Sequence, residues 1–284
     1  MIIKHIDTLF HGTVKISHLV SIIQNGFYPS YANEPFASRN TKILMVSFSN
    51  IPLIEARNQV NYGDYFIGLK RDWGISNQLH PVAYSYQDSK YEKDVNYLQL
   101  ESAIGQTLHL LRSFHDNGIK MDFGGEALQL VAELSRQDIS EETSVTLNKM
   151  FEKIYVKIND MQLYLKHYKV TDKKGLSRYA YNDREWRYIP YDIEQRRLLF
   201  ETDASGKNIN PEYTKYDQMK KPHFKSHPLL FGIDDITYII VKKKEEIKRI
   251  YKVLEKKYGS TRVYENITNG NLTVLSIDKI WSDL

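Results

Sequence analysis

The sequence predicts an α+β protein in which two β-rich regions flank a helical insertion, and three observations indicate this architecture. Residues 1–91 contain four short apolar segments bounded by turn residues, a pattern typical of strands. Residues 92–162 instead carry leucine and isoleucine at helical spacing. Residues 163–284 return to strand-like segments and end in a strand–helix–strand unit. We therefore expect a β core whose two halves are separated along the chain by a helical subdomain.

The composition restricts the class of protein. The chain has 284 residues, of which 42% are hydrophobic and 26% are charged, as in ordinary soluble globular proteins. It contains no cysteine, which excludes a disulfide framework, a thiol nucleophile and a zinc–thiolate site. It also lacks a signal peptide and any apolar run of about 18 residues, so we expect a cytoplasmic protein without a membrane span. The net charge of +4 neither requires nor excludes a nucleic-acid partner.

The first predicted strand covers residues 8–13 and leads directly into a helix. Ser17 is the predicted N-cap of this helix, and Asn25-Gly26 is a typical helix end. Residues 30–41 are rich in Ser, Asn, Pro and Ala and are predicted to form a loop.

The remaining strands of the N-terminal region follow at short intervals. An apolar run at 43–49 predicts a strand that Pro52 stops. The turn at 61–64 precedes a predicted strand at 65–70, and a loop around Trp73-Gly74 leads to a short strand at 81–84.

The C-terminal region contains strand-like segments at 163–168 and 185–190. Residues 202–228 are polar, with three prolines and several lysines, and are the best candidate for a mobile loop. The chain then ends in a predicted strand at 236–241, a helix at 244–257 and a strand at 272–277.

Two polar motifs lie in strand-like segments that are far apart in the sequence. Residues i and i+2 of a strand share one face, so His11 and Thr13 are expected to point together, as are Glu185 and Arg187. An imidazole and a hydroxyl on one wall of a cleft, with a carboxylate on another, suit a site that handles ribose or nucleotides. We therefore take the two motifs as a candidate catalytic site.

Each motif also has a structural interpretation. His11 could donate a hydrogen bond to a ribose hydroxyl, or a nearby carbonyl could satisfy it at the end of a strand. Glu185 could accept a proton from a ribose hydroxyl and stabilise an oxocarbenium-like centre. Alternatively, it is a strand carboxylate paired with Arg184 or Arg187.

A basic run begins at Lys242, Lys243 and Lys244 and continues along the predicted terminal helix. It could contact nucleic acid or an acidic partner, or form a solvated helix face interleaved with glutamates. Asp234-Asp235 has no second carboxylate pair at a suitable spacing, so no metal site is expected. The chain also lacks a glycine-rich phosphate loop.

Several segments, in order, resemble the AbiGi family of bacterial abortive-infection proteins. The segments are Leu9–Thr13 with its helix and Gly26, Ile43–Leu53, Tyr62–Leu69 with Trp73, Lys166–Tyr168, Arg184–Pro190 and Phe231–Val241. This resemblance spans nearly the whole chain outside the insertion and the 202–228 loop. It implies a protein of phage-defence operons, usually an antitoxin beside a nucleotidyltransferase-like toxin.

The first segment is also similar to the opening of DarT-type ADP-ribosyltransferases, in which a strand bearing His-x-Thr precedes a helix that ends in glycine. This similarity implies a split β core of ADP-ribosyltransferase type and NAD as a substrate. It implies that His11, Gly12 and Thr13 bind NAD and that Ser47 or Tyr65 lies near the nicotinamide. Glu185 would then be the catalytic carboxylate.

Two functions follow as hypotheses. As an enzyme, the protein would transfer ADP-ribose from NAD to a macromolecular acceptor, or hydrolyse NAD. As a catalytically inactive antitoxin, it would bind a partner toxin or operator DNA through residues such as Arg187 and Lys242–Lys244. A nuclease is disfavoured because a metal-binding carboxylate cluster is missing.

Overall fold

The computed structural model describes residues 6–34, 40–53, 55, 62–87, 89–90, 160–171, 177–190, 198–201, 210–218, 224–225 and 227–282. The chain divides into two compact units, one formed by Met1–Tyr84 with Lys166–Leu284 and the other by Ser85–Leu165. The predicted helical insertion at 92–162 lies outside the described residues, apart from its last three.

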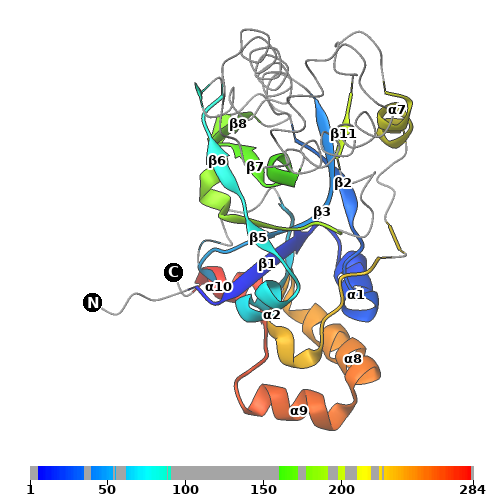
Figure 1. Cartoon of the computed structure of the whole chain (residues 1–284). Helices are drawn as coiled ribbons and strands as arrows, with labels where there is room; N and C mark the ends of the chain where they lie inside the picture. The colour runs from blue at the N-terminus through cyan, green and yellow to red at the C-terminus, as the bar shows by residue number, and fades with distance from the viewer. Residues whose placement is uncertain are drawn as a thin grey trace, which may run out of the picture. The chain divides into compact units, whose positions relative to one another are not determined.

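The described part of the chain is a mixed α+β structure built around a sheet (Figure 1). The strands are β1 (Thr8–Thr13), β2 (Ser30–Asn33), β3 (Thr41–Ser49), β4 (Tyr65–Lys70), β5 (His80–Pro81), β6 (Ala83–Ser85), β7 (Leu165–His167), β8 (Lys169–Thr171), β9 (Ser177–Tyr179), β10 (Glu185–Tyr188), β11 (Leu198–Phe200), β12 (Ile236–Val241) and β13 (Thr273–Ser276). The helices are α1 (Ile16–Asn25), α2 (Arg71–Ser76), α7 (Pro211–Gln218), α8 (Ile247–Tyr258), α9 (Ser260–Thr268) and α10 (Ile277–Ser282), with 3₁₀ turns η2 (Ala180–Asp183), η4 (Ile233–Asp235) and η5 (Lys244–Glu246).

Among the described residues, the main sheet has the strand order β13-β12-β4-β1-β3-β10-β5, and β2 and β11 both pair with β3. The pairs within it are antiparallel except for β12 and β13, which run parallel. Two helices, α8 and α9, connect β12 to β13, where the sequence predicted one. Two further two-stranded sheets consist of β6 with β7 and of β8 with β9. The order places β1 and β10 on either side of β3, although they are far apart in the sequence.

Each face of the sheet has its own apolar layer. On one face, Leu9, Phe48 and Ile67 pack against α1, α2, α8 and α9, which supply buried side chains such as Leu19 and Leu254. These helices lie together on one side of the strands in Figure 1. The opposite face carries a smaller cluster of Phe10, Ile51, Phe66, Ile240 and Ile277, the last of which belongs to α10. Successive side chains of β1 point to opposite faces, so Leu9 belongs to one layer and Phe10 to the other.

The predicted strands at 8–13, 43–49, 65–70 and 236–241 are confirmed as β1, β3, β4 and β12. The helix after β1 ends at Asn25 as predicted, with Gly26 at a φ of 82°. Its start was predicted wrongly, because Lys15 rather than Ser17 is the N-cap and makes no side-chain capping bond.

Three predicted loops contain regular structure. In the 30–41 segment, Ser30–Asn33 forms β2, because pairing with β3 satisfies backbone groups whose local sequence favours a turn. Around Trp73-Gly74 the chain forms α2, where Trp73 is buried and its indole N–H donates to the carbonyl of Leu230 at 3.1 Å.

The third such loop is the 202–228 segment, which contains α7. Asn210 caps this helix, and its side-chain oxygen accepts the amide of Glu212 at 3.0 Å. Pro211 occupies the first helical position, where its missing N–H has no cost. The pair Asn210-Pro211 therefore marks the start of a helix, although its segment was predicted from the sequence to be a loop.

Gly63 provides a test of how closely β1 and the turn before β4 approach. Its φ is 109°, and a Cβ at this position would overlap the backbone of Thr13 and Val14. We predict that Gly63→Ala lowers the free energy of unfolding by roughly 3 kcal/mol or more, because backbone strain and overpacking add. Urea denaturation measures this loss.

Gly270→Ala is the matched control, because this glycine also has a positive φ, of 72°, but nothing lies within 4 Å of an added Cβ. We expect it to cost roughly 1 kcal/mol, from backbone strain alone. Equal losses in the two variants would contradict the close contact between Gly63 and β1.

Candidate functional site

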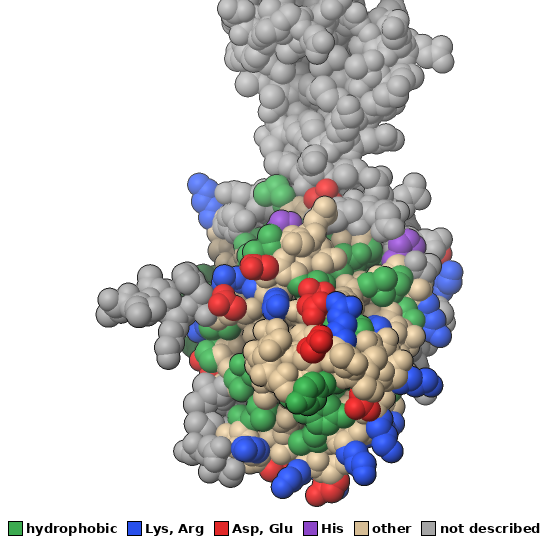
Figure 2. Space-filling view, turned by 90° about the horizontal axis from the view of Figure 1, so that it is seen from below, with side chains coloured by type: hydrophobic (Ala, Val, Ile, Leu, Met, Phe, Trp, Pro, Cys, Tyr) green, Lys and Arg blue, Asp and Glu red, His purple; other side chains and the backbone are tan. Residues whose placement is uncertain are grey.

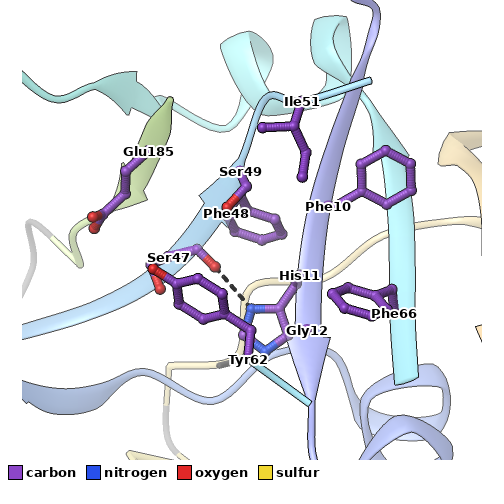
Figure 3. Close-up of a pocket in the computed structure, with 10 residues that line it drawn as sticks. All are labelled: Phe10, His11, Gly12, Ser47, Phe48, Ser49, Ile51, Tyr62, Phe66 and Glu185. Atoms are coloured by element: carbon purple, nitrogen blue, oxygen red, sulfur yellow. Dashed lines mark hydrogen bonds between the residues drawn. The ribbon is translucent and has the colours of Figure 1, made fainter. Parts of the chain in front are cut away.

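The sheet is split between β1 and β3, and the candidate site lies at this split. β1 pairs with β4 along its whole length but with β3 only at Phe10 and Ser49. Beyond this pair the imidazole of His11 lies in the gap, and its Nδ1 is 2.8 Å from the carbonyl oxygen of Ser47 (Figure 3). With Nδ1 protonated, His11 donates a hydrogen bond to the carbonyl of Ser47. This side-chain bond takes the place of a backbone hydrogen bond between β1 and β3. Burial lowers the pKa of His11, which keeps the ring neutral.

His11 and Glu185 approach the split from opposite faces of the sheet. Glu185 pairs with Ser49, which in turn pairs with Phe10, so its side chain belongs to the Phe10 face. His11 is the next residue along β1 and belongs to the other face, where its ring contacts Phe27 and Phe48 at centroid distances of 5.0 and 5.6 Å. Figure 3 shows β3 running between the two side chains.

A small cavity nevertheless joins the predicted residues. It is lined by Phe10, His11, Gly12, Ser47, Phe48, Ser49, Ile51, Tyr62, Phe66 and Glu185 (Figure 3). The centre of a water molecule can reach only about 30 Å³ of it, which is room for one or two waters. Ligand pockets usually measure several hundred Å³, so the cavity as it stands does not hold a dinucleotide.

Glu185 belongs to a buried cluster of two acids and two bases. Its Oε1 accepts the Nε–H of Arg187 at 2.7 Å, and its Oε2 accepts the ammonium of Lys166 at 2.5 Å. Glu34 completes the cluster, 3.3 Å from Lys166 and 3.2 Å from Arg187. The Arg187 side chain has 0% exposure, and that of Glu185 has 5%. The structural interpretation of Glu185 as the ion-pair partner of Arg187 therefore matches the contacts that form.

The cluster fixes the ionisation of Glu185. Burial alone raises its pKa, but the charges of Arg187 and Lys166 and their hydrogen bonds outweigh burial and lower the pKa to about 2. Both carboxylate oxygens are occupied by cations, which leaves the group fully ionised and held in place.

A second network lies beside the first and was not expected from the sequence. Tyr62, which lines the cavity, donates its hydroxyl to Asp183 at 2.8 Å, and Arg178 binds both oxygens of Asp183 at 2.8 and 2.7 Å. Burial and the neighbouring Asp183 carboxylate raise the pKa of Tyr62, so the phenol stays protonated. Tyr62, in the turn before β4, was the one feature of the sequence that could have indicated this network. Its partners Arg178 and Asp183 lie 116 and 121 residues downstream, so the sequence alone does not connect them.

The structure does not bring the other predicted residues to the cavity. Thr13 shares a hydrogen bond with His18 at 3.2 Å, and the hydroxyl of Tyr65 donates to Glu246 at 2.9 Å. Of the residues predicted to bind NAD, only His11, Gly12 and Ser47 line the cavity.

The predicted partner-binding residues divide into buried and exposed groups. Arg187, predicted to contact a partner or nucleic acid, is fully buried in the ion cluster and offers no surface for such a contact. Lys242 is exposed but bonded to Asp64 at 2.6 Å, while Lys243 and Lys244 are exposed beside it. Figure 2 shows Lys and Arg side chains along the rim of the face near α8 and α9, with acidic side chains among them.

Among the described residues, no helix combines the length and the apolar composition that a membrane span requires. Within the same residues, no group of three His, Asp or Glu side chains is placed to hold a metal ion.

The buried cluster makes a prediction about stability. We expect Glu185→Gln to lower the free energy of unfolding by about 3–5 kcal/mol, because among the described residues it leaves Glu34 as the counter-charge of both Lys166 and Arg187. Chemical denaturation measures this loss. Glu212→Gln is the control, since Glu212 and Lys215 form an exposed pair at 3.8 Å, and we expect a change below about 0.5 kcal/mol. Similar small changes in both variants would contradict the cluster.

The same cluster predicts acid sensitivity. In the folded protein the pKa of Glu185 is about 2, below its ordinary value of 4.5. The unfolded chain therefore binds a proton at Glu185 more readily than the folded protein does. The stabilising contribution of Glu185 is therefore complete above about pH 4.5 and is lost as the pH falls towards 2. We predict that the stability difference between wild type and Glu185→Gln shrinks by roughly 3 kcal/mol over this window. A pH-independent difference would contradict the assignment.

Comparisons with known proteins identify the family. The sequence model described as "Putative abortive phage resistance protein AbiGi, antitoxin" matches residues 25–242. The chain is also 24% identical over 252 residues to the abortive phage resistance protein AbiGi of Lactococcus lactis subsp. cremoris, covering 84% of this chain and 88% of the relative. No solved structure gives a significant match.

The family match includes only some of the predicted site residues. Glu185, Arg187 and Lys166 lie within the range matched by the family, whereas His11, Gly12 and Thr13 precede it. The similarity of β1 to DarT-type enzymes and an ADP-ribosyltransferase-like fold remain predictions. The family match covers most of the chain, and the protein belongs to the AbiGi family of abortive phage resistance proteins.

Proposed function

We propose that this protein is the antitoxin of a phage-defence pair and acts by binding a protein partner rather than by catalysis. The family description supports the antitoxin role. The absence of catalysis is supported by one observation. Glu185, the residue expected to drive ADP-ribose transfer, forms ion pairs with both Lys166 and Arg187.

A catalytic carboxylate must reach the reacting atoms of its substrate. Glu185 has both oxygens bound to cations, is almost fully buried and faces a cavity with room for one or two waters. Stabilising a positive charge at an anomeric carbon would require this carboxylate to leave Arg187 or Lys166. The arrangement favours a role in holding β10 in place.

An NAD-dependent activity is the second candidate, and one observation favours it. His11, Gly12, Ser47 and Glu185 line a single cavity although they come from three separate strands. If Tyr62 and the surrounding chain moved apart, this cavity could open into a cleft for NAD. The protein would then transfer ADP-ribose to a macromolecular acceptor or hydrolyse NAD.

The antitoxin role is tested with the protein encoded next to this chain in its host genome. We expect co-expression with this chain to relieve the growth arrest that the neighbouring protein causes, and the two to elute together in size-exclusion chromatography. A chain that neither relieves toxicity nor forms a complex would contradict the proposal.

The two candidates predict different responses to NAD. We predict that 1 mM NAD leaves the melting temperature of the wild-type protein unchanged, because the cavity does not admit a dinucleotide. A ligand present at about 100 times its Kd adds about 2.7 kcal/mol of stability, which shifts the melting temperature by several degrees. Such a shift, together with release of nicotinamide from labelled NAD, would favour the enzyme. Wild-type protein is the sample of choice, because Glu185→Gln is expected to be destabilised.

A further inference from the structure

Four tyrosines form a continuous aromatic patch beside the ion cluster. The ring of Tyr84 packs on that of Tyr181 at a centroid distance of 5.4 Å, and Tyr181 packs on Tyr168 at 5.7 Å. Tyr168 in turn packs edge-on against Tyr179 at 5.5 Å. We call these four residues the tyrosine patch.

The patch is unusually open for aromatic side chains that pack together. Tyr179 is 53% exposed and Tyr181 is 52% exposed. Tyrosine is enriched among the residues that dominate protein–protein binding, because it buries a large area at a small cost in conformational entropy. The exposed rings are therefore suitable anchors for a partner.

The backbone that carries the patch is held rigidly. Asp183, which ends η2, is fixed by Arg178 and Tyr62. Arg184 adopts a positive φ of 43°, and its carbonyl accepts the amide of Asn50 at 3.1 Å. A non-glycine residue in this region of backbone space costs free energy and persists only where its surroundings impose it. These contacts hold the turn that follows Tyr181 in place.

The exposed charged side chains on the described segments that carry Tyr168, Tyr179 and Tyr181 are positive. Lys169 and Arg184 are exposed on the same short segments, whereas Asp183 is buried against Arg178. Among residues 168–171 and 177–184, the carboxylate of Asp183 is the single acidic group, so no exposed acidic side chain lies there. A partner that covers the rings would meet a positive rim and should carry carboxylates opposite it.

Nucleic acid fits these observations less well than protein. A protein that follows a phosphate backbone commonly makes six to ten cationic contacts, and the described residues of this rim include two exposed cations, Lys169 and Arg184. Successive bases also stack on a row of parallel aromatic faces, whereas Tyr84 with Tyr181 and Tyr168 with Tyr179 meet edge to face.

We propose that the tyrosine patch is the surface through which this protein binds its partner protein, with acidic side chains of that partner facing Lys169 and Arg184. This inference rests on the proposed antitoxin function and specifies where the partner docks. The ion cluster contributes indirectly, since the hydroxyl of Tyr84 accepts the backbone amide of Glu185 at 2.9 Å.

The test uses full-length protein and the purified product of the neighbouring gene, with affinity measured by isothermal titration calorimetry. We expect the double variant Tyr179→Ala/Tyr181→Ala to bind at least about 30-fold more weakly than wild type. Tyr264→Ala is the matched control, because Tyr264 lies on α9 and is 69% exposed, and we expect its affinity to stay within about twofold of wild type. Lys169→Glu should slow association and weaken its dependence on salt.

The outcomes separate the two proposals. If wild type binds and the double variant binds equally well, the patch proposal is wrong while the antitoxin function stands. If wild type does not bind, the antitoxin function and the patch proposal both fail. If a labelled 20-nucleotide single-stranded RNA binds wild type but not the double variant, while the partner binds both, the patch is a nucleic-acid surface and the proposal is overturned. Circular dichroism and melting temperatures confirm that each variant is folded.

Discussion

Three buried charges and the half-buried carboxylate of Glu34 hold together strands that the sequence places far apart. Glu185 and Arg187 on β10, Lys166 on β7 and Glu34 after β2 form a neutral cluster in which each acid contacts both bases. Taking charges out of water is costly, and such a cluster is tolerated only when every member has partners. The arrangement therefore fixes the position of β10 beside β3, and with it the turn that carries the tyrosines.

The ion cluster also affects the groups available at the split between β1 and β3. β1 separates from β3 after one residue pair, and His11 fills the opening by bonding to the carbonyl of Ser47. A split of this kind could hold a ligand if the groups around it were free to engage one. Here the imidazole is bonded to backbone, the carboxylate of Glu185 is bound to two cations, and Tyr62 is tied to Asp183. Each of these three groups is therefore engaged by a partner within the fold.

Hydrophobic periodicity and turn residues were sufficient to predict β1, β3, β4 and β12, because these strands are buried and their apolar runs are long. They failed for β2, which depends on pairing with β3, and for α2, which depends on burial of Trp73. For the site, the sequence indicated that Glu185 and Arg187 share a face, but alternation within a strand cannot tell a catalytic carboxylate from a paired one. That distinction depends on Lys166 and Glu34, which reach Glu185 and Arg187 only in the folded chain.

The central claim is that the buried charges serve structure alone, and replacing them together tests it most directly. Substituting Glu34, Lys166, Glu185 and Arg187 by apolar residues of similar size removes the four charges of the cluster together, and such replacements often preserve or increase stability. The measurement is whether a variant shown to be folded relieves the toxicity of the proposed partner toxin as wild type would. Our account predicts relief equal to that of wild type. A folded variant that still binds its partner but gives no relief would contradict it.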